Sequence, residues 1–534
     1  MDKDFIKGAA VLGIAGIIVK ILGAVYRLPL SNIIKSEGMG YYQTAYPLYT
    51  LLLTISTAGF PIAIAKLVSE RRAIGDHKNA FKVFKVALMG LFLGGIITSL
   101  FVLFQGENIV DRLGNKNAYY ALIALVPALL FVPIMAAFRG FYQGRQSMVP
   151  TAISQIVEQF FRVVVGLSLT YFLLDRGIPM AAGGASFGGS IGAFAGLLVI
   201  GAAYILGRQR IKDEISSTKL GEDYPVGQII KDLLIISIPI TIGASVVPIM
   251  DTIDVVIVLK QLQYIGYSEE LANDLYGNLK GMASTLINLP QVLSVAIAIS
   301  LVPAISKANA RKNRREMEGI ISSGIRITLL IGLPAALGLY VLARPIIELL
   351  YYKNDMATIA NTANLLSILS FGVIFLTMVQ SLSAILQGLG KPIIPAINLF
   401  IGAVAKVILS YTLTKIPDIN IYGAAFSTVT AYGIASILDL ISVKKHAKIK
   451  LNFMDVFIKP LISAVGMALL VFLSYSVLVG ILGSKLSTVS AIFVGAVLYG
   501  ILLLVTGSIT SADLRLLPKG DKIGKIIDKF KLIK

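Results

Sequence analysis

The sequence contains no cysteine and only two histidines, His77 and His446. Without cysteine the chain can form no disulfide, no thiolate nucleophile and no cysteine-ligated metal site. Both histidines lie in charged stretches of sequence, so a histidine-ligated metal centre is not expected either. Tryptophan is also absent, which leaves the 22 tyrosines as the aromatic residues for a membrane interface.

Charged residues are scarce as well. They make up 14% of 534 residues, whereas a soluble domain has about 25%. Hydrophobic residues reach 56%, the mean hydropathy is +0.81, and apolar runs recur along the whole chain. Each run has about the twenty residues that a helix needs to cross a bilayer. Since the runs do not alternate as barrel strands do, an all-α membrane protein is predicted.

Fourteen apolar stretches predict fourteen transmembrane helices. The first stretch, 8–30, contains Lys20 and Arg27 and is longer than the core of a cleavable signal peptide. The predicted spans are 5–30, 41–65, 83–104, 118–138, 150–174, 184–206, 232–259, 277–305, 324–343, 359–386, 393–414, 421–442, 455–480 and 487–507.

The distribution of Lys and Arg predicts the orientation of these helices. The net charge of +19 is concentrated in alternate loops, including 66–85, 208–219, 307–315 and 444–450. The intervening loops carry few basic residues. The positive-inside rule explains this pattern without nucleic acid as a partner. We therefore expect a multi-pass protein of the bacterial cell membrane with both termini in the cytoplasm.

A polar linker at 207–231 divides the chain. It separates an N-terminal six-helix lobe, 1–206, from a C-terminal six-helix lobe, 232–442. A shift of 244 residues aligns Gln143-Gly144 with Gln387-Gly388 and Arg162 with Lys406, which indicates an internal repeat. The predicted fold is thus two lobes with pseudo-twofold symmetry about the membrane normal, a common transporter plan.

Two further segments follow the lobes. The stretch 455–507 supplies two extra transmembrane helices. The tail 508–534 is basic, with isoleucines and a phenylalanine at helical spacing, and is predicted to be an amphipathic helix on the anionic inner leaflet. A disordered basic tail is the alternative.

Ionisable residues inside the predicted spans are functional candidates, because a charge in the bilayer needs a partner or a water-filled cavity. Lys20 and Arg27 share one face of the first helix. The alternative for Arg27 is that its long side chain extends along the helix and places the charge at the membrane–water interface. Glu158 and Arg162 are four residues apart, which suits an intrahelical ion pair. Such a pair is either structural or in contact with a substrate.

The remaining candidates lie in the second half of the chain. Asp251 and Asp254 share one helix face and would bind a cation or proton, or balance basic residues. Asn398 lies in the same predicted helix as Lys406, which matches Arg162 in the repeat. Asp439, near a predicted helix end, is expected to be structural. The excess of Lys and Arg predicts a basic cavity for an anion such as a phosphate or diphosphate.

Several stretches resemble a known family. Residues 139–162, RGFYQGRQSMVPTAISQIVEQFFR, are similar to the signature of the Gram-positive polysaccharide transporter branch of the MOP flippase superfamily. This branch includes MurJ-type lipid II flippases and proteins of the stage V sporulation protein B type. Residues 59–70, 333–351 and 387–395 add to the resemblance, which extends from about residue 5 to 442.

The resemblance implies a V-shaped central cavity that opens alternately to each side of the membrane. The implied cargo is an undecaprenyl-diphosphate-linked saccharide, above all lipid II, moved to the outer leaflet for cell-wall or spore-cortex synthesis. Residues 455–507 would flank a groove for the lipid tail. Lys20 matches a family arginine that holds the diphosphate. Asp251 or Asp254 and Asn398 match a cation site of some relatives, but Gly402 stands where its second acid would be.

The resemblance also implies the partners. They are a lipid-linked oligosaccharide and membrane lipids, with cell-wall synthesis proteins as further candidates, and a monomer is expected. No cofactor is expected; the membrane potential, H⁺ and Na⁺ are the candidate energy sources. The main alternative is a MATE-type cation-coupled multidrug antiporter, whose site would be dominated by acids. A membrane glycosyltransferase would need a large outer loop, which is absent among the predicted loops, and no enzymatic activity is expected.

Overall fold

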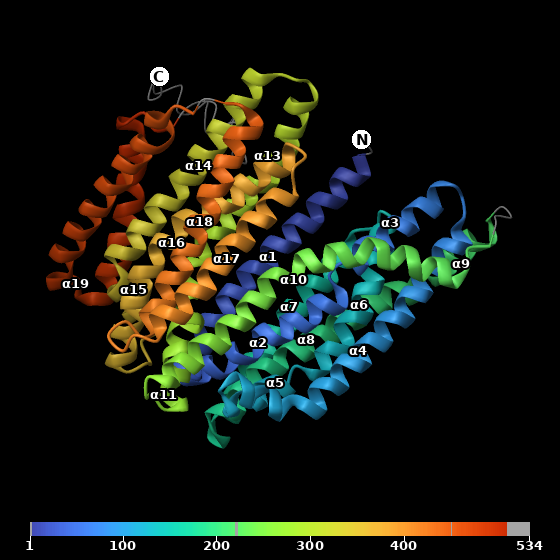
Figure 1. Cartoon of the computed structure of the whole chain (residues 1–534), viewed down its shortest axis with the longest axis horizontal. Helices are drawn as coiled ribbons and strands as arrows, with labels where there is room; N and C mark the ends of the chain where they lie inside the picture. The colour runs from blue at the N-terminus through green and yellow to red at the C-terminus, as the bar shows by residue number, and fades with distance from the viewer. Residues whose placement is uncertain (1–2, 219–222, 450, 510–534) are drawn as a thin grey trace. The chain divides into compact units, whose positions relative to one another are not determined.

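The computed structural model describes residues 3–218, 223–449 and 451–509, and every element of secondary structure within them is helical (Figure 1). The predicted amphipathic tail falls almost entirely on residues 510–534, outside the described residues. Thirteen helical segments among the described residues are long and apolar enough to cross a membrane. The all-α membrane fold predicted from composition is therefore confirmed.

The thirteenth segment is far longer than one crossing requires. It runs over Met454–Val505, 52 residues, and would measure about 78 Å as one straight helix. The backbone leaves the helical region inside it at Gly483, with φ 73° and ψ 166°, values that glycine adopts at little cost. This segment is long enough for two crossings of a core about 30 Å thick. The count of fourteen and the twofold symmetry of the lobes stay predictions.

The chain forms two compact units. The first comprises residues 1–263 and 267–277, the second the remainder. The predicted boundaries of the two lobes, at residues 206 and 232, stay a prediction. The helices of the first unit are α1 Lys3–Ile33, α2 Lys35–Thr57, α3 Phe60–Ala73, α4 His77–Leu113, α5 Tyr119–Ile123, α6 Val126–Gly144, α7 Val149–Leu173, α8 Ile178–Leu206, α9 Arg208–Ser216, α10 Val226–Tyr264 and α11 Glu269–Tyr276.

The second unit is built from the later helices. Two π-helical stretches, Gly277–Ala283 and Met454–Ile458, precede α12 and α19. Its core joins residues of α13, α14, α16, α18 and α19, among them Leu301, Ile325 and Leu382. The helices are α12 Ser284–Ile287, α13 Leu289–Ala310, α14 Arg314–Val341, α15 Ala343–Leu350, α16 Met356–Gly388, α17 Ile393–Thr414, α18 Ile421–Ala447 and α19 Lys459–Val505.

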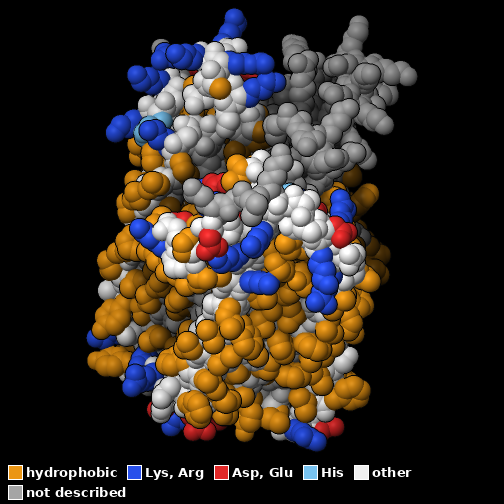
Figure 2. All heavy atoms as spheres, turned by 90° about the vertical axis from the view of Figure 1, so that its right-hand side faces the viewer, with side chains coloured by type: hydrophobic (Ala, Val, Ile, Leu, Met, Phe, Trp, Pro, Cys, Tyr) orange, Lys and Arg blue, Asp and Glu red, His pale blue; other side chains and the backbone are white. Residues whose placement is uncertain are grey.

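Large apolar side chains are exposed along the outer faces of the helices. On α4 the side chains of Phe92, Ile97 and Phe104 are 39%, 67% and 76% exposed. Figure 2 shows hydrophobic side chains covering much of the visible face, with Lys and Arg side chains above and below the main hydrophobic area. A soluble protein rarely exposes apolar patches of this extent, so these faces are the ones expected to meet lipid.

Helices α7 and α8 pack against each other at unusually close range. Gly184, Gly188, Gly192 and Gly196 follow at intervals of four and form one face of α8. A Cβ atom at Gly188 would lie 2.4 Å from Cα of Gly166, and one at Gly192 would lie 2.4 Å from the backbone oxygen of Glu158. Small residues at this spacing let helix backbones touch in a membrane. The packing fixes the stretch of α7 that carries Glu158 and Arg162.

Candidate functional site

A cluster of three charged side chains lies within the membrane-spanning part of the first unit. Glu158 and Arg162 come from α7, and Arg139 comes from α6. All three are within segments that qualify as membrane spans, Lys116–Gly144 and Val149–Arg176. Their side chains are only 15–16% exposed. Charges so placed require partners.

Glu158 is the shared partner of both arginines. Arg139 Nη2 lies 2.9 Å from Glu158 Oε2, and Arg162 Nη2 lies 3.3 Å from Glu158 Oε1. Arg139 also donates from Nε to Ser154 Oγ at 3.1 Å, one helical turn away from Glu158. One carboxylate thus balances two guanidinium groups, which leaves the Arg139–Glu158–Arg162 cluster with a formal charge of +1.

Arg162 keeps unused hydrogen-bonding capacity. Its Nε atom is buried and has no hydrogen-bond partner among the described residues. A guanidinium group has five N–H donors in a planar fork that suits phosphate oxygens. The combination of a surplus positive charge and an unused donor is suited to an anionic group.

Tyrosines of α2 lie close to this cluster. Tyr42, Tyr46 and Tyr49 interact electrostatically with Arg162. Their rings follow one face of α2, with centroids 5.5 Å apart for Tyr42 and Tyr46 and 5.8 Å apart for Tyr46 and Tyr49. Tyr26 of α1 is buried, and its hydroxyl donates to the carbonyl oxygen of Ala185 on α8 at 3.0 Å. Helices α1 and α2 thus line the surroundings of Arg162 with aromatic hydroxyl groups.

Lys20 and Arg27, the two basic candidate residues of α1, differ in their exposure. Lys20 is exposed, and no hydrogen bond or ion pair of its side chain occurs among the described residues. Arg27 is half-buried, one residue after the buried Tyr26. Helix α1 packs against α7, where a Cβ at Gly23 would lie 3.4 Å from the side-chain nitrogen of Gln159.

The predicted coupling residues are divided between the two units. Asp251 is half-buried and Asp254 is buried, both in α10 of the first unit. Asn398 and Lys406 belong to α17 of the second unit. Asn398 is buried and donates from Nδ2 to Asp439 Oδ1 at 2.8 Å. No group of three or more His, Cys, Asp or Glu side chains suited to a metal ion occurs within the described ranges.

Comparison with known proteins decides the family. The sequence pattern described as polysaccharide biosynthesis protein matches residues 5–309, more than half of the chain. The chain belongs to the polysaccharide biosynthesis protein family. The chain thereby belongs to the MOP superfamily of membrane transporters, and a second pattern, MatE, matches residues 280–412.

Relatives of this family member are similar over nearly the whole chain. Stage V sporulation protein B of Bacillus subtilis is 29% identical and covers 98% of this chain and 99% of its own length. Lipid II flippase MurJ of the same organism is 29% identical over 84% of each chain. The uncharacterized membrane protein YabM, also of Bacillus subtilis, is 29% identical over 98% of this chain and 96% of its own length.

Solved structures show the same fold for this family member. A structure of lipid II flippase MurJ in an inward closed conformation has a TM-score of 0.69 at 18% identity, covering 93% of this chain and 98% of that one. An inward-facing multidrug resistance MATE transporter has a TM-score of 0.65 at 15% identity, covering 80% and 94%. The MurJ-like and MATE-like fold predicted by the resemblance is confirmed, and the V-shaped cavity stays a prediction.

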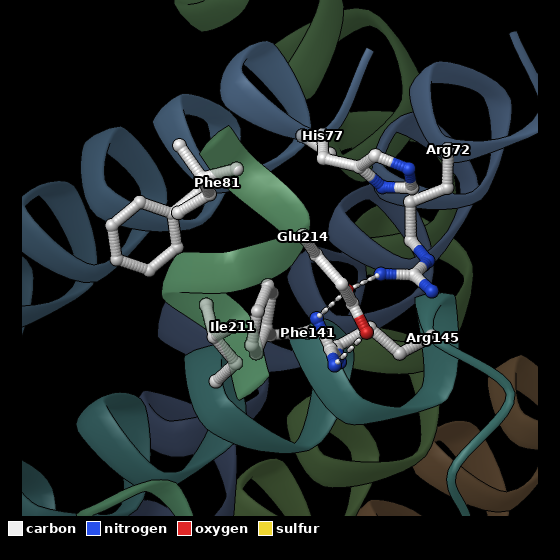
Figure 3. Close-up of a pocket in the computed structure, with 9 residues that line it drawn as sticks. Arg72, His77, Phe81, Phe141, Arg145, Ile211 and Glu214 are labelled. Carbon is white, nitrogen blue, oxygen red and sulfur yellow. Dashed lines mark hydrogen bonds and ion pairs between the residues drawn. The ribbon is translucent and has the colours of Figure 1, made fainter. Parts of the chain in front are cut away.

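The stretch that carries the family resemblance, 139–162, contributes residues to two ionic clusters of the first unit. The second cluster lies outside the spans, where Glu214 of α9 points at the guanidinium groups of Arg145 and Arg72 (Figure 3). Arg145 holds both carboxylate oxygens, at 2.8 and 3.0 Å. Burial alone would raise the pKa of Glu214, but the hydrogen bonds from Arg72 and Arg145 outweigh it and lower the pKa. Glu214 thereby attaches the segment between the two predicted lobes to α3 and α6.

Sequence reasoning missed Arg139 and the tyrosines. The apolar pattern predicts a span over 118–138 that ends just before Arg139, whereas α6 continues to Gly144 and includes this residue. The tyrosines did carry a signal, because Tyr42, Tyr46 and Tyr49 have the i, i+4, i+7 spacing of one helix face.

Proposed function

We propose that this family member is a flippase that moves a lipid-linked saccharide with a diphosphate head group from the cytoplasmic to the outer leaflet. Lipid II is the leading candidate. The proposal places the protein in the bacterial cell membrane with both termini in the cytoplasm, and alternating access carries the head group across. The observation that carries the proposal is the formal charge of +1 on the Arg139–Glu158–Arg162 cluster.

The chemistry of the cluster supports an anionic cargo. Arg and Lys pair with phosphate oxygens through charge-assisted hydrogen bonds, and Arg does so with a planar fork. When a diphosphate arrives, the guanidinium group of Arg162 can turn some of its N–H donors from Glu158 to the ligand. Arg139 meanwhile keeps the Glu158 carboxylate paired. Lys20 and Arg27, on the helix that packs against α7, would supply further positive charge. Lys406 is the corresponding base of the second unit.

The names of the relatives point in the same direction. Lipid II flippase MurJ and stage V sporulation protein B are similar over most of their lengths. Choosing between lipid II and another lipid-linked glycan requires a direct assay. The most informative one uses a strain whose own lipid II flippases are depleted, with lipid II on the outer face measured by an impermeant probe.

In that assay the wild-type chain should restore outward lipid II. Arg162→Gln should fail to restore it although the protein accumulates in the membrane, because Arg139 and Glu158 remain as a balanced pair. Lys20→Ala should fail likewise, and Lys20→Arg should retain activity. The matched control is Lys415→Ala, an exposed residue at the end of α17 that takes no part in the cluster. Full activity of both Arg162→Gln and Lys20→Ala would overturn the proposal.

A MATE-type antiporter for organic cations is the second candidate. The MatE pattern over residues 280–412 and the fold of MATE transporters favour it, as do the acids Asp251 and Asp254. Resistance to cationic drugs that depends on Asp251 and Asp254, together with no effect on lipid II, would establish this candidate in place of the flippase.

A further inference from the structure

An apolar groove lies between α4 and the beginning of α10, apart from the charged clusters described above. All the residues that line it are apolar, and they include Phe60 of α3, Val86, Met89 and Leu93 of α4, and Val226 and Ile230 of α10. We call this feature the α4–α10 groove. Its volume is about 430 Å³, within the range of about 300–1,000 Å³ that is typical of ligand sites.

The floor of the α4–α10 groove is part of the packed interior of the first unit. Ala87 and Leu233 are buried and belong to one apolar cluster with Phe84. On the rim, by contrast, the side chains of Met89 and Leu93 are 62% and 51% exposed. Packing therefore fixes the floor while the rim stays open to the surroundings, and a preformed site of this kind binds with a smaller ordering cost.

A second groove lies on the neighbouring face of α10. Its volume is about 630 Å³, and Gly227, Lys231 and Ile238 are among the residues that line it. We call it the α10 groove. Ile230 and Leu234 line both grooves and form the ridge between them. A lipid with two acyl chains can place one chain on each side of this ridge, whereas a single chain occupies one groove only.

Both grooves lie at the end of the first unit where α4 and α10 begin. Lys82 Nζ of α4 lies 2.9 Å from Oδ1 of Asp223, three residues before α10, so the two helix starts are side by side. From Val226 to Leu234 a helix rises about 12 Å, which is less than half of a hydrocarbon core about 30 Å thick. The grooves therefore belong to a single leaflet, the one next to the basic loops.

Lysines are concentrated at this end of the grooves. Lys78, Lys82 and Lys85 lie within the first nine residues of α4, and that helix carries no Asp or Glu before Glu107. Lys231 lines the α10 groove itself. Basic pockets between transmembrane helices are suited to the head groups of anionic lipids.

The carboxylates of the same region do not cancel this charge. Asp223 pairs with Lys82, and Asp232 accepts hydrogen bonds from two residues of its own segment. Lys85 and Lys231 are exposed and form no ion pair with any residue that the structure describes. In the first nine residues of α4 and in 223–239, four lysines stand against two carboxylates, which leaves a formal charge of +2.

We propose that the α4–α10 groove and the α10 groove together bind one anionic phospholipid, with an acyl chain in each groove and the phosphate group at Lys85 and Lys231. The bound lipid would hold the start of α10 against α4. A polyprenyl chain is a poorer fit, because it is single and the grooves form a pair along one helix. The site does not rest on the proposed flippase function, so it can be tested without any cargo.

The absence of tryptophan from the chain makes the site measurable. Met89→Trp would place the only indole of the full-length protein on the rim of the α4–α10 groove. Ile437→Trp is the matched control, because this residue is 55% exposed, lines neither groove and lies ten residues before the end of α18, near Lys444 and Lys445. Acyl chains that carry bromine quench the fluorescence of an indole that they touch.

The measurement uses phosphatidylcholine vesicles in which an increasing fraction is either brominated phosphatidylglycerol or brominated phosphatidylcholine. At equal fractions, phosphatidylglycerol should quench Met89→Trp more strongly than phosphatidylcholine does. The two lipids should quench Ile437→Trp alike. Equal quenching of Met89→Trp by both lipids, or the same preference in Ile437→Trp, would overturn the proposal, because the contacts would then be those of ordinary surrounding lipid.

Lysine variants in the Met89→Trp background test the head-group position. Lys85→Ala and Lys231→Ala should each lower the preference for phosphatidylglycerol about fivefold. The control is Lys307→Ala, an exposed lysine in the last turn of α13, which should leave the preference unchanged. An unchanged preference in both Lys85→Ala and Lys231→Ala would overturn the proposal, as would an equal loss in Lys307→Ala.

Glycine variants in the same background test the acyl-chain position. Gly90→Leu adds a side chain inside the α4–α10 groove and should weaken quenching by brominated phosphatidylglycerol, whereas Gly94→Leu, one turn further along α4, should not. Apart from the nearby α4 backbone and the neighbouring residues in sequence, no described heavy atom lies within 4 Å of a Cβ built at either glycine. Equal quenching in the two variants would overturn the placement of the chain.

Competition distinguishes the phospholipid from the proposed cargo. Lipid II without bromine, added to the vesicles, should relieve the quenching of Met89→Trp no more than the same amount of phosphatidylcholine does. If lipid II displaces brominated phosphatidylglycerol, the groove holds the tail of the cargo, and the phospholipid site is overturned while the flippase proposal stands. Failure of the flippase in the outer-leaflet lipid II assay leaves the phospholipid site unaffected.

Discussion

Glu158 is the residue on which the charge balance of the first unit depends. It pairs with Arg139 at 2.9 Å and with Arg162 at 3.3 Å, and all three side chains are largely buried. Removing one partner of a buried ion pair typically costs about 3–5 kcal/mol, because the remaining charge is left uncompensated. The three possible single substitutions are therefore not equivalent.

Glu158→Gln should be the most damaging, since it leaves two guanidinium groups close together without a carboxylate. Arg162→Gln should be mild, because Arg139 and Glu158 remain paired. Thermal unfolding of the detergent-solubilised protein measures both effects, and the loss for Glu158→Gln is expected to be about 3 kcal/mol or more. Equal stability of Glu158→Gln and the wild type would show that the cluster contributes nothing to folding.

Glu214 leads to a prediction about pH. Its pKa in the folded protein lies below the ordinary value of 4.5, because the hydrogen bonds and charges of Arg72 and Arg145 outweigh its burial. A carboxyl group with a lowered pKa stabilises the folded state above its unfolded pKa. The attachment of α9 should be complete above pH 4.5 and should weaken as the pH falls through the lowered value.

Limited proteolysis of the linker in detergent checks this expectation. Cleavage near α9 should be slow at neutral pH and should accelerate in acid. Glu214→Gln should be cleaved quickly already at neutral pH. Asp213→Asn is the control, because within the described residues the carboxylate of Asp213 accepts a hydrogen bond only from Gln209 of the same helix. If the linker of Glu214→Gln resists cleavage as well as that of the wild type, α9 is held by its apolar contacts, such as those of the buried Ile211.

At the scale of helices, the close approach of α7 and α8 makes a sharp prediction. Gly188→Ala would place a methyl group 2.4 Å from Cα of Gly166. Because backbone atoms cannot yield as a flexible side chain can, the helices must separate, which should cost about 1–3 kcal/mol.

Gly201→Ala in the same helix is the matched control. Apart from the nearby backbone of α8 and the neighbouring residues in sequence, no described heavy atom lies within 4 Å of the position where its Cβ would be built. Replacing a glycine inside a helix by alanine usually stabilises it by about 0.5–1 kcal/mol. Thermal unfolding should therefore rank Gly201→Ala at or above the wild type and Gly188→Ala below it. The reverse order would contradict the packing of α7 and α8.

The sequence was a good guide to elements and a poorer guide to contacts between them. Apolar runs identify helices because lipid forces the backbone to satisfy its own hydrogen bonds. They do not locate helix ends, because polar residues continue a helix beyond the apolar run, as Arg139 does in α6. The ion pair of Glu158 with Arg162 can be predicted from the sequence, because the two residues are four apart on one helix face. The bond between Asn398 and Asp439 joins residues 41 apart, so only tertiary packing brings them together.

At the scale of the whole molecule, the absence of cysteine makes the orientation testable. Any cysteine introduced is the only thiol in the chain. Arg311 and Glu270 are both exposed, in loops that the positive-inside rule assigns to opposite sides. In whole cells an impermeant thiol reagent should label Glu270→Cys and spare Arg311→Cys. Permeabilised cells provide the control, since both variants should then react. Labelling of Arg311→Cys in intact cells would invert the proposed topology.

The glycine face of α8 has a mechanical consequence for any transport cycle. Where backbones touch at Gly188 and Gly192, sliding one helix along the other would drive carbonyl oxygens into Cα atoms. Helices α7 and α8 can therefore move only together, as one rigid unit. Glu158 and Arg162 move with this helix pair, whereas Arg139 belongs to α6. Any tilt of the helix pair against α6 would first lengthen the distance between Arg139 and Glu158, so this single ion pair would report the relative movement of the helices around it.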